Sequence, residues 1–181
     1  MSNTRELRRR IKSVKNTAQI TKAMQMVAAT KMRRAQNQAL SGRPYTQTLN
    51  QALGQLLPKI EQGLHPLLQE NNATKSGIIL LSTDKGLAGA LNTNLFRATI
   101  NFISDKKDVE FFTQGKKARQ LVIKLNKTLV ADFENPDTVN FRQATQISKI
   151  VVEQFLNKEL KEVYLIYPDF ISALRQEPKI I

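Results

Sequence analysis

The first forty residues follow one uninterrupted helical pattern, and this pattern constrains the fold more than any other feature. Neither glycine nor proline occurs before Gly42 and Pro44, so nothing in this stretch breaks a helix. The spacing of a repeated row of residues, here named the seam, alternates between four and three and is typical of a coiled coil over more than four heptads. The seam consists of Leu7, Ile11, Val14, Ala18, Thr21, Gln25, Ala28, Met32, Ala35 and Ala39.

The seam is apolar but narrow, because alanine and threonine occupy positions where leucine would be expected. Ile20, Met24 and Val27 widen it by one position. A narrow seam favours close approach of another helix over burial against a bulky core. The pattern continues past Pro44, where we expect a bend, to Leu57. A helix over residues 3–57 would be about 80 Å long, longer than any globular core of this chain could cover.

Positive charge is concentrated in the same segment. The first forty residues contain ten Lys or Arg and a single acid, Glu6, whereas the other 141 residues contain eighteen basic and fourteen acidic residues. The basic character therefore belongs to the helix and not to the rest of the chain. Such a charge predicts an acidic partner, which could be nucleic acid, an anionic membrane or an acidic protein surface.

The rest of the chain predicts a small α/β domain. Residues 58–76 contain Pro58, Gly63 and Pro66 and are interpreted as a linker, which leaves residues 1–57 as a long basic helix and 77–181 as the α/β domain. Strands are expected at 77–82, 109–113, 128–132 and 163–167, with helices at 91–104, 115–126 and 141–157 and a turn at 135–137. This alternation favours a mostly parallel, Rossmann-like sheet. Residues 170–181 are too few to supply a second long helix.

Composition excludes several classes of protein. The chain has no cysteine, which excludes disulfides, thiol catalysis and cysteine metal sites. The single histidine, His65, has no second ligand at a metal-binding spacing, and the acids of the α/β domain are scattered, so we predict no cofactor, no metal and no catalytic site. No apolar run is long enough to span a membrane. The N-terminus is not a secretory signal, and the continuing repeat argues against a mitochondrial transit peptide.

The loop between the first strand and the following helix is the sharpest local motif. It reads DKGLAGALN over residues 84–92, in a position where glycine-rich loops can hold phosphate. It has two glycines instead of the dinucleotide pattern of three and lacks the lysine–hydroxyl pair of a P-loop. A tight turn into a helix is therefore favoured over a nucleotide site. A third interpretation is a surface loop that docks another protein through Asp84, Lys85 and Asn92.

The basic clusters of the helix allow a second class of function. Arg8-Arg9-Arg10 and Arg33-Arg34 could bind phosphates, so a basic coiled-coil protein that binds nucleic acid is the alternative hypothesis. Nucleic-acid readers of this kind usually place the basic region beside a dimerisation zipper, whereas here the charges and the seam overlap. A solvated basic face is the simplest interpretation, although ten basic residues to one acid exceeds what solubility requires.

Two motifs closely resemble the gamma subunit family of F-type ATP synthases. Residues 9–36 read RRIKSVKNTAQITKAMQMVAATKMRRAQ and resemble the N-terminal helix of that family, and residues 82–96 read STDKGLAGALNTNLF and resemble its second signature. Arg43-Pro44-Tyr45 and residues 164–167 also fit. The resemblance covers essentially the whole chain. Ala88 stands where the family usually has cysteine, and Lys85 where arginine is common.

The resemblance implies a non-catalytic rotor subunit of the central stalk, which couples proton flow to ATP synthesis by turning inside a ring of alternating alpha and beta subunits. It further implies an epsilon subunit and a membrane c-ring as partners, with no binding of nucleic acid and no direct insertion into the membrane. The implied location is peripheral, on the cytoplasmic face of a bacterial plasma membrane, which is favoured over mitochondria or plastids.

The resemblance also implies which residues contact the ring. Basic residues of the shaft in this family meet acidic loops of beta, and the second signature lies near one of those loops. The implied contact residues are Arg8, Arg9, Lys12, Met24, Lys31, Arg33, Arg34, Asp84, Lys85, Gly86 and Asn92. The family pairs its N-terminal helix with a long C-terminal helix that this sequence lacks. We therefore expect a fragment, a truncated product or a divergent form.

Overall fold

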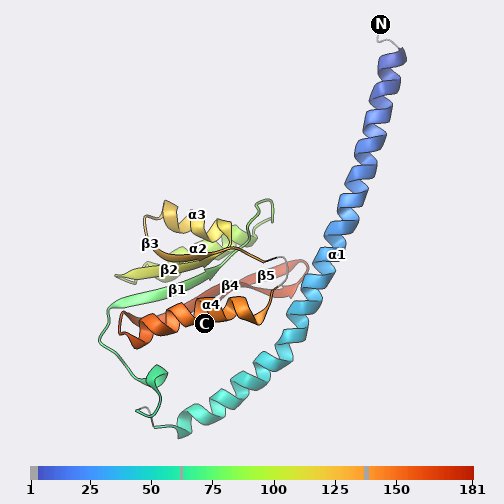
Figure 1. Cartoon of the computed structure of the whole chain (residues 1–181). Coiled ribbons are helices and arrows are strands. Elements are labelled where there is room, and N and C mark those ends of the chain that lie inside the picture. Colours follow the sequence, from blue (N-terminus) through green and yellow to red (C-terminus); the bar gives the residue numbers. More distant parts are fainter. Residues whose placement is uncertain (1–3, 62, 137–138) are drawn as a thin grey trace. The chain divides into compact units, whose positions relative to one another are not determined.

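The computed structural model describes residues 4–61, 63–136 and 139–181, and the chain divides into two compact units, Met1–Ile60 and Glu61–Ile181 (Figure 1). Each unit is described by itself. The first residue of the predicted helix, Asn3, and the last of the predicted turn, Asp137, lie outside the described residues.

The first unit is a single long helix, α1 (Thr4–Leu56), followed by a short 3-10 turn, Leu57–Lys59. The helix runs for 53 residues and continues through Pro44, and Figure 1 shows it curving instead of breaking. No residue of α1 is buried. The predicted long helix is thus confirmed, and its seam is open to solvent within this unit.

Threonine side chains along α1 return their hydroxyl groups to the helix itself. Thr17 Oγ1 donates to the carbonyl of Ser13 at 3.0 Å, and Thr21 Oγ1 donates to the carbonyl of Thr17 at 2.8 Å. Thr48 makes the same bond to Pro44 at 2.9 Å. Because each hydroxyl donates to a carbonyl one turn earlier in the helix, these threonine side chains are less polar toward a partner than free hydroxyl groups would be. The polar position Thr21 is therefore compatible with a helix-packing seam.

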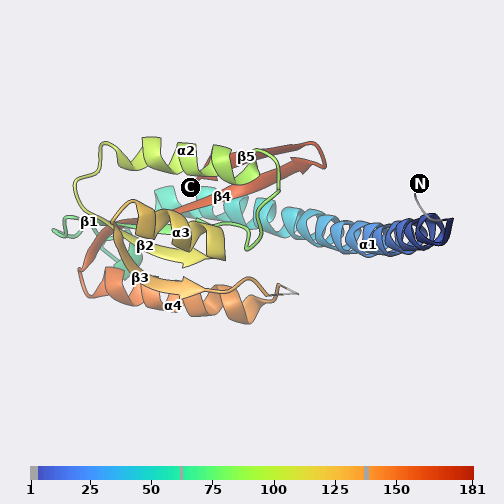
Figure 2. The ribbon, with the colours of Figure 1, turned by 90° about the horizontal axis from the view of Figure 1, so that it is seen from above.

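The second unit is built on a five-stranded sheet with the order β3-β2-β1-β4-β5 (Figure 2). The strands are β1 (Lys75–Leu81), β2 (Val109–Gln114), β3 (Thr128–Phe133), β4 (Leu160–Ser172) and β5 (Arg175–Ile180). The first four are parallel to their neighbours, and β5 runs antiparallel to β4. Ile78 of the central strand lies between Phe111 and Tyr164. This confirms the predicted mostly parallel sheet.

Three helices cover both faces of the sheet. They are α2 (Leu91–Ile103), α3 (Lys116–Lys124) and α4 (Phe141–Leu156). One core joins α2 and α3 to the sheet around Leu95, Phe111 and Val122, all fully buried. A smaller core joins α4 to the other face around Phe112 and Leu160. Because both faces are covered, the central strand is a continuous apolar run instead of an alternating one.

The C-terminal strand β5 was not predicted from the sequence. Residues 170–181 were expected only to be too few for a second long helix, yet Pro178 lies directly opposite Pro168 in the antiparallel pair. A proline is tolerated there because β5 is an edge strand, whose outward backbone groups need no partner. The predicted strand at 163–167 is likewise only the centre of the longer β4, and β1 begins two residues before its predicted start.

Candidate docking surfaces

Most of the predicted basic contact residues of α1 lie on the side of the helix away from the seam. At about 100° per residue, Arg9, Lys12, Arg33 and Arg34 project from the side away from the seam, whereas Arg8 lies near one border of the seam. Met24 and Lys31 lie near the other border of the seam by the same rule. The helix can therefore contact a helical partner along one side while presenting positive charge on the other.

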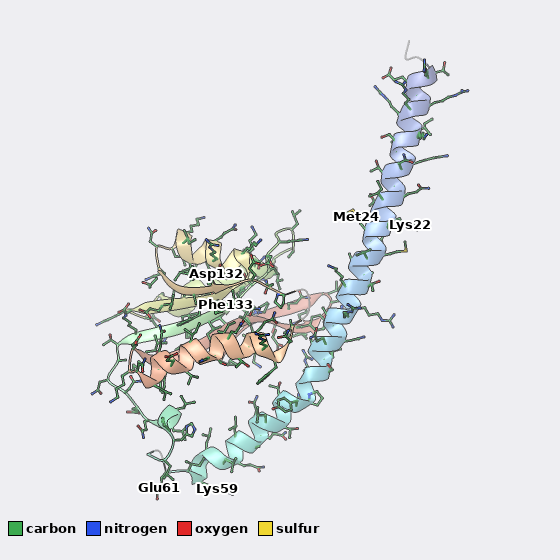
Figure 3. The ribbon with its side chains drawn as sticks, viewed as in Figure 1. Lys22, Met24, Lys59, Glu61, Asp132 and Phe133 are labelled. Atoms are coloured by element: carbon green, nitrogen blue, oxygen red, sulfur yellow. The ribbon has the colours of Figure 1, made fainter. Side chains whose placement is uncertain are left out.

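The seven predicted contact residues of α1 are all solvent exposed. Figure 3 shows side chains, Met24 and Lys22 among them, projecting outward from the helix. The acid of this segment, Glu6, is paired with Arg10 at 2.7 Å. It therefore leaves the charge of the two arginine clusters largely uncompensated, as an acidic partner would require.

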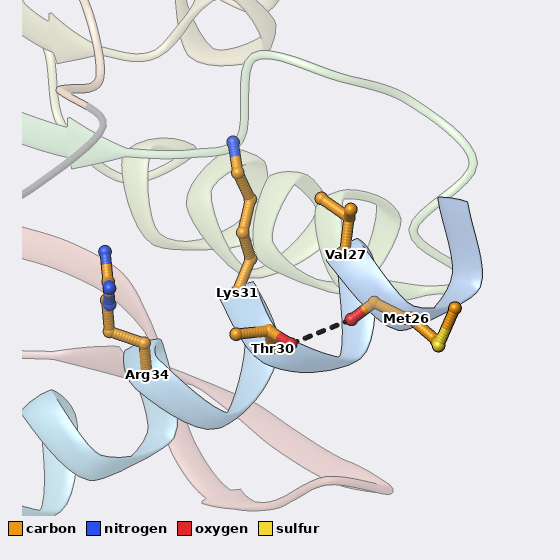
Figure 4. Close-up of a pocket in the computed structure, with 5 residues that line it drawn as sticks. All are labelled: Met26, Val27, Thr30, Lys31 and Arg34. Carbon is orange, nitrogen blue, oxygen red and sulfur yellow. Dashed lines mark hydrogen bonds between the residues drawn. The ribbon is translucent and has the colours of Figure 1, made fainter. Parts of the chain in front are cut away.

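The surface around Thr30 shows what α1 presents locally (Figure 4). Met26, Val27, Thr30, Lys31 and Arg34 line it, and all belong to the same helix. Thr30 Oγ1 donates to the carbonyl of Met26 at 2.9 Å. These side chains form a shallow helix surface with apolar and cationic parts, which suits contact with another protein better than enclosure of a small molecule.

The loop after β1 is anchored to the start of α3. Asp84 Oδ1 accepts a hydrogen bond from the backbone N–H of Lys116 at 2.9 Å, and the carbonyl of Thr83 accepts from Lys117 at 3.1 Å. The third N–H of α3 donates to Ser82 Oγ at 2.6 Å. The donors that could hold a phosphate at this helix end are therefore occupied within the chain.

Asn135 and Gly115 complete this anchor, and sequence reasoning missed both roles. Asn135 Nδ2 donates to the carbonyl of Ser82 at 2.8 Å and to Asp84 Oδ1 at 3.2 Å. Gly115 has φ +97°, and a Cβ there would lie 2.3 Å from the carbonyl oxygen of Ser82. The only available signals were an Asn-Pro turn and a glycine before a helix. The structure thus gives Asp84 an internal role beside its predicted contact role.

The tip of the loop is exposed, in contrast to its base. Lys85 and Gly86 are exposed, and a side chain at Gly86 would meet nothing closer than 3.8 Å. Gly89 has φ +59°, a conformation that favours glycine. Asn92 is half-buried, and its Nδ2 donates to Thr83 Oγ1 at 2.8 Å. Of the four predicted contact residues in this loop, Lys85 and Gly86 are exposed, whereas Asp84 and Asn92 make hydrogen bonds that support the loop.

Comparison with known proteins identifies the family. The pattern that describes the ATP synthase family matches residues 3–181. The chain belongs to this family. It is 43% identical over 183 residues to the ATP synthase gamma chain of Methylacidiphilum infernorum, covering 98% of this chain and 62% of that protein. It is 41% identical over 180 residues to the ATP synthase gamma chain of Opitutus terrae, covering 99% of this chain and 60% of that protein. The predicted resemblance is confirmed.

Solved structures agree with this assignment. The central stalk and c-ring structure of the Tetrahymena thermophila mitochondrial ATP synthase contains a chain that is similar with a TM-score of 0.66 and 26% identity, over 90% of this chain and 70% of that one. A chain of the Euglena gracilis mitochondrial ATP synthase is similar in fold with a TM-score of 0.54. The present chain spans less than two thirds of the length of the gamma chains cited above.

A polar cluster in the α/β unit of this family member has a structural role that its sequence did not reveal. Glu162 Oε1 accepts from Lys106 Nζ at 2.6 Å and from Ser76 Oγ at 2.8 Å, and Tyr164 donates to Oε2 at 2.8 Å. The hydrogen bond from Lys106, with those from Ser76 and Tyr164, lowers the pKa of Glu162 to about 2 against the opposing effect of burial. Lys106 also lies over the Phe102 and Tyr164 rings. The cluster links β4 to β1 and α2.

Other candidate sites in the described residues lack reactive chemistry. His65 Nδ1 accepts from the N–H of Leu67 at 3.2 Å and so supports a 3-10 turn. Within the described part of the chain, no three acidic or histidine side chains gather in a way that could hold a metal. An apolar groove of about 300 Å³ lies between α4 and the sheet, with Ser148 as its one polar side chain. Among the described helices, none has the length and apolarity needed to cross a bilayer.

Proposed function

We propose that this chain is the central-stalk, or rotor, subunit of a proton-translocating F-type ATP synthase. It couples proton flow to ATP synthesis by turning within a ring of alpha and beta subunits. The observation that carries this proposal is α1, a 53-residue helix without a single buried residue. Long helices owe most of their stability to packing, so a helix of this length with an open apolar seam requires a partner. Family membership supports an ATP synthase complex as the source of that partner.

The two sides of α1 serve different contacts in this proposal. The seam pairs with another helix, and the side that carries Arg9, Lys12, Arg33 and Arg34 faces acidic loops of the ring. Arg8 lies at one border between these contacts, and Met24 and Lys31 lie at the other. In the α/β unit, Lys85 and Gly86 meet a further loop of beta, while Asp84 and Asn92 hold that loop in shape. The epsilon subunit and the membrane c-ring are the proposed partners of the rest of the stalk.

The proposed role is mechanical, and the chain has no catalytic site of its own. Two observations support this. The backbone donors at the start of α3, to which the glycine-containing loop is anchored, are occupied by Asp84, Thr83 and Ser82, so this helix end offers no phosphate cradle. The apolar groove beneath α4 offers no convergent polar groups. The bacterial relatives support a peripheral location on the cytoplasmic face of a bacterial plasma membrane.

Reconstitution tests the proposal. The chain is mixed with purified alpha and beta subunits of the same organism, and assembly is followed by size-exclusion chromatography. We expect one molecule of the chain to elute with the ring and to lose affinity as salt rises, since exposed charges are screened. A variant with Arg8, Arg9, Arg33 and Arg34 changed to Gln should bind more weakly and with less dependence on salt. Failure of the unaltered chain to elute with the ring would contradict the proposal.

Duplex DNA separates this proposal from the nucleic-acid alternative, which the comparisons do not support. A rotor helix should bind DNA weakly, without sequence preference, and release it steeply as salt increases. Calorimetric titration with ATP and Mg²⁺ should likewise give no micromolar binding. Tight, sequence-selective DNA binding near physiological salt would favour the alternative.

A further inference from the structure

The apolar seam of α1 continues beyond Ala39 to the end of the helix. The same alternating spacing of four and three residues adds the positions Gly42, Thr46, Leu49, Leu53 and Leu56. The seam and these added positions are here named the extended seam. Within α1, which the structure describes in full, no residue is buried, so the extended seam is open to solvent. A repeat sustained over about seven heptads is typical of a two-helix coiled coil.

Side-chain size along the extended seam is nearly symmetrical about its middle. The middle contains mainly alanine, threonine and glycine. Large apolar side chains, each 44–67% exposed, lie at both ends: Leu7, Ile11 and Val14 at one, and Leu49, Leu53 and Leu56 at the other. When the row is reversed, large side chains face large ones and small face small, so the row is complementary to an antiparallel copy of itself. Such self-complementarity is what a two-fold symmetric interface requires.

One antiparallel register pairs the row from Ile11 to Leu56. In it, Ile11 of one copy lies opposite Leu56 of the other. Further facing pairs are Val14 with Leu53, Ala18 with Leu49, Thr21 with Thr46, and Ala28 with Ala39. The threonine pair is compatible with burial, because each hydroxyl already donates to a carbonyl four residues earlier, at 2.8 Å and 3.2 Å.

Charge selects the antiparallel arrangement over the parallel one. The first forty residues carry ten basic residues and one acid, whereas residues 44–58 carry no charged side chain. Parallel helices would place the two basic segments side by side, where like charges repel. In the antiparallel register, residues 9–23 of each copy lie beside the uncharged residues 44–58 of the other. The densest positive charges are thus kept apart, although the pair as a whole stays positive.

The contact area is sufficient for a specific dimer. The 53 residues of α1 extend over about 80 Å, and a contact strip of one helix diameter, about 10 Å, buries about 800 Å² of each copy. That area is usual for a specific interface. The small side chains of the middle and the remaining positive charge limit the affinity. We therefore expect a micromolar dissociation constant, so that dilution gives a monomer with an open helix.

We propose that two copies of this chain, when free of the ring, pair antiparallel along the extended seam. Pairing occupies the side of α1 that the rotor function assigns to another helix. The dimer and the assembled stalk are therefore alternatives, and the dimer shields the apolar row until assembly. This inference goes beyond the proposed function and does not rest on it, because it concerns the chain by itself.

Sedimentation of the full chain over a range of concentrations tests the proposal. We expect a reversible equilibrium between monomer and dimer, without larger species. Raising the salt concentration should strengthen the dimer, because both copies are positive and salt screens their repulsion. Salt should weaken binding to acidic loops of the ring, so the two associations respond to salt with opposite signs.

The test variant combines Val14→Gln with Leu53→Gln, which face each other at both ends of the dimer. We expect its dissociation constant to rise about tenfold or more, as for anchor residues of an interface. The control variant, Met26→Gln with Leu40→Gln, changes apolar residues that are 60% and 47% exposed on the side of α1 away from the extended seam. Its dissociation constant should change by less than about twofold.

Cysteine cross-linking tests the direction of the helices, because the chain has no cysteine of its own. One protein carries Ile11→Cys and the other Leu56→Cys. In the antiparallel register, the same position in the two copies is about 70 Å apart, too far for a disulfide. We expect a disulfide only when the two variants are mixed.

The outcomes separate this inference from the proposed function. The inference is overturned if the unaltered chain stays monomeric at every concentration and salt, or forms larger oligomers. A test variant that dimerises as well as the unaltered chain, or a disulfide formed by Ile11→Cys alone, would overturn it as well. The rotor function is decided separately, by binding to the ring. If the chain dimerises as described but does not bind the ring, the rotor function fails and the inference stands.

Discussion

The helix α1 and the α/β unit obtain their stability in different ways. Residues such as Ile78, Phe111 and Phe112 have no exposed surface, and two cores hold the sheet between its helices. In α1 no residue is buried, and Ile11, Val14 and Ile20 are each more than half exposed. The α/β unit can therefore fold by its own contacts, whereas α1 depends on contacts from outside its unit. Apolar residues of one chain thus serve either the fold or the assembly.

Truncating an apolar side chain should give the largest difference in stability loss between the two regions. Phe111→Ala should destabilise the α/β unit by about 3–5 kcal/mol, because it leaves a cavity in the larger core. Val14→Ala, at a 67% exposed position of α1, should leave the free chain unchanged within about 0.5 kcal/mol. Urea unfolding followed by tyrosine fluorescence measures the first effect, and far-ultraviolet circular dichroism the second. Equal losses at both positions would show that the seam is packed within the chain.

A glycine substitution should have opposite signs in the two regions. Gly115→Ala should destabilise the α/β unit by about 3 kcal/mol, since φ is +97° and the new Cβ would meet the Ser82 carbonyl at 2.3 Å. In α1, Gly54 has nothing within 4 Å of an added Cβ. Gly54→Ala should therefore stabilise the helix by about 0.5–1 kcal/mol. Thermal melts of both variants measure the contrast. A neutral result at Gly115 would show that the anchor of α3 is misassigned.

The Glu162 cluster predicts how the α/β unit responds to acid. The pKa of Glu162 is lowered to about 2 from an ordinary 4.5 by its hydrogen bonds from Lys106, Ser76 and Tyr164. Its stabilisation is complete above pH 4.5 and is lost as pH falls towards 2. We expect about 1–2 kcal/mol, because the carboxylate side chain is 36% exposed and solvent screens its partners.

The matched variant for this measurement is Glu162→Gln. Its free energy of unfolding should be lower than that of the unaltered chain at pH 6, and the two should converge near pH 2. A difference between the two proteins that stays constant from pH 6 to pH 2 would exclude the assigned role of the carboxylate. The helicity of α1 should be insensitive to this substitution at every pH.

The two charged residues at the start of the glycine-containing loop should differ in their effects. Asp84→Ala removes the acceptor for the N–H of Lys116 and should destabilise the unit by about 1 kcal/mol. Lys85→Ala changes an exposed side chain and should alter stability by less than about 0.5 kcal/mol. In assembly with the alpha and beta subunits we expect the opposite ranking, so that Lys85→Ala weakens binding to the ring more than Asp84→Ala does. If Lys85→Ala unfolds the free chain, its assignment as a docking residue is wrong.

Periodicity predicted the long helix and most of the sheet because each of these elements is long or strongly apolar. The seven-residue β1 was recognisable from its continuous apolar run, and α1 from its seam. β5 was missed because its segment contains Pro178, and a strand with a proline is recognisable here only from its antiparallel pairing with β4. The predicted division into a helix (1–57), a linker (58–76) and an α/β domain (77–181) stays a prediction.

The candidate contact residues were only partly predictable for a similar reason. Basic residues on α1 are visible in the sequence, since exposure follows from the helical period. Whether a loop residue points inward or outward depends on contacts between distant segments. Asp84 could not be recognised as the partner of Lys116 and Asn135 without the fold.

Hydrogen exchange of the backbone amides tests the central claim most directly, because it reports both regions in one experiment. The free monomeric chain and the chain bound to the ring of alpha and beta subunits are compared under the same conditions. The account predicts slow exchange in the core strands β1 and β2 in both samples. In α1, exchange should be fast in the free chain and slow over much of residues 4–56 in the complex. Strong protection of α1 in the free monomer, or none in the complex, would contradict the account.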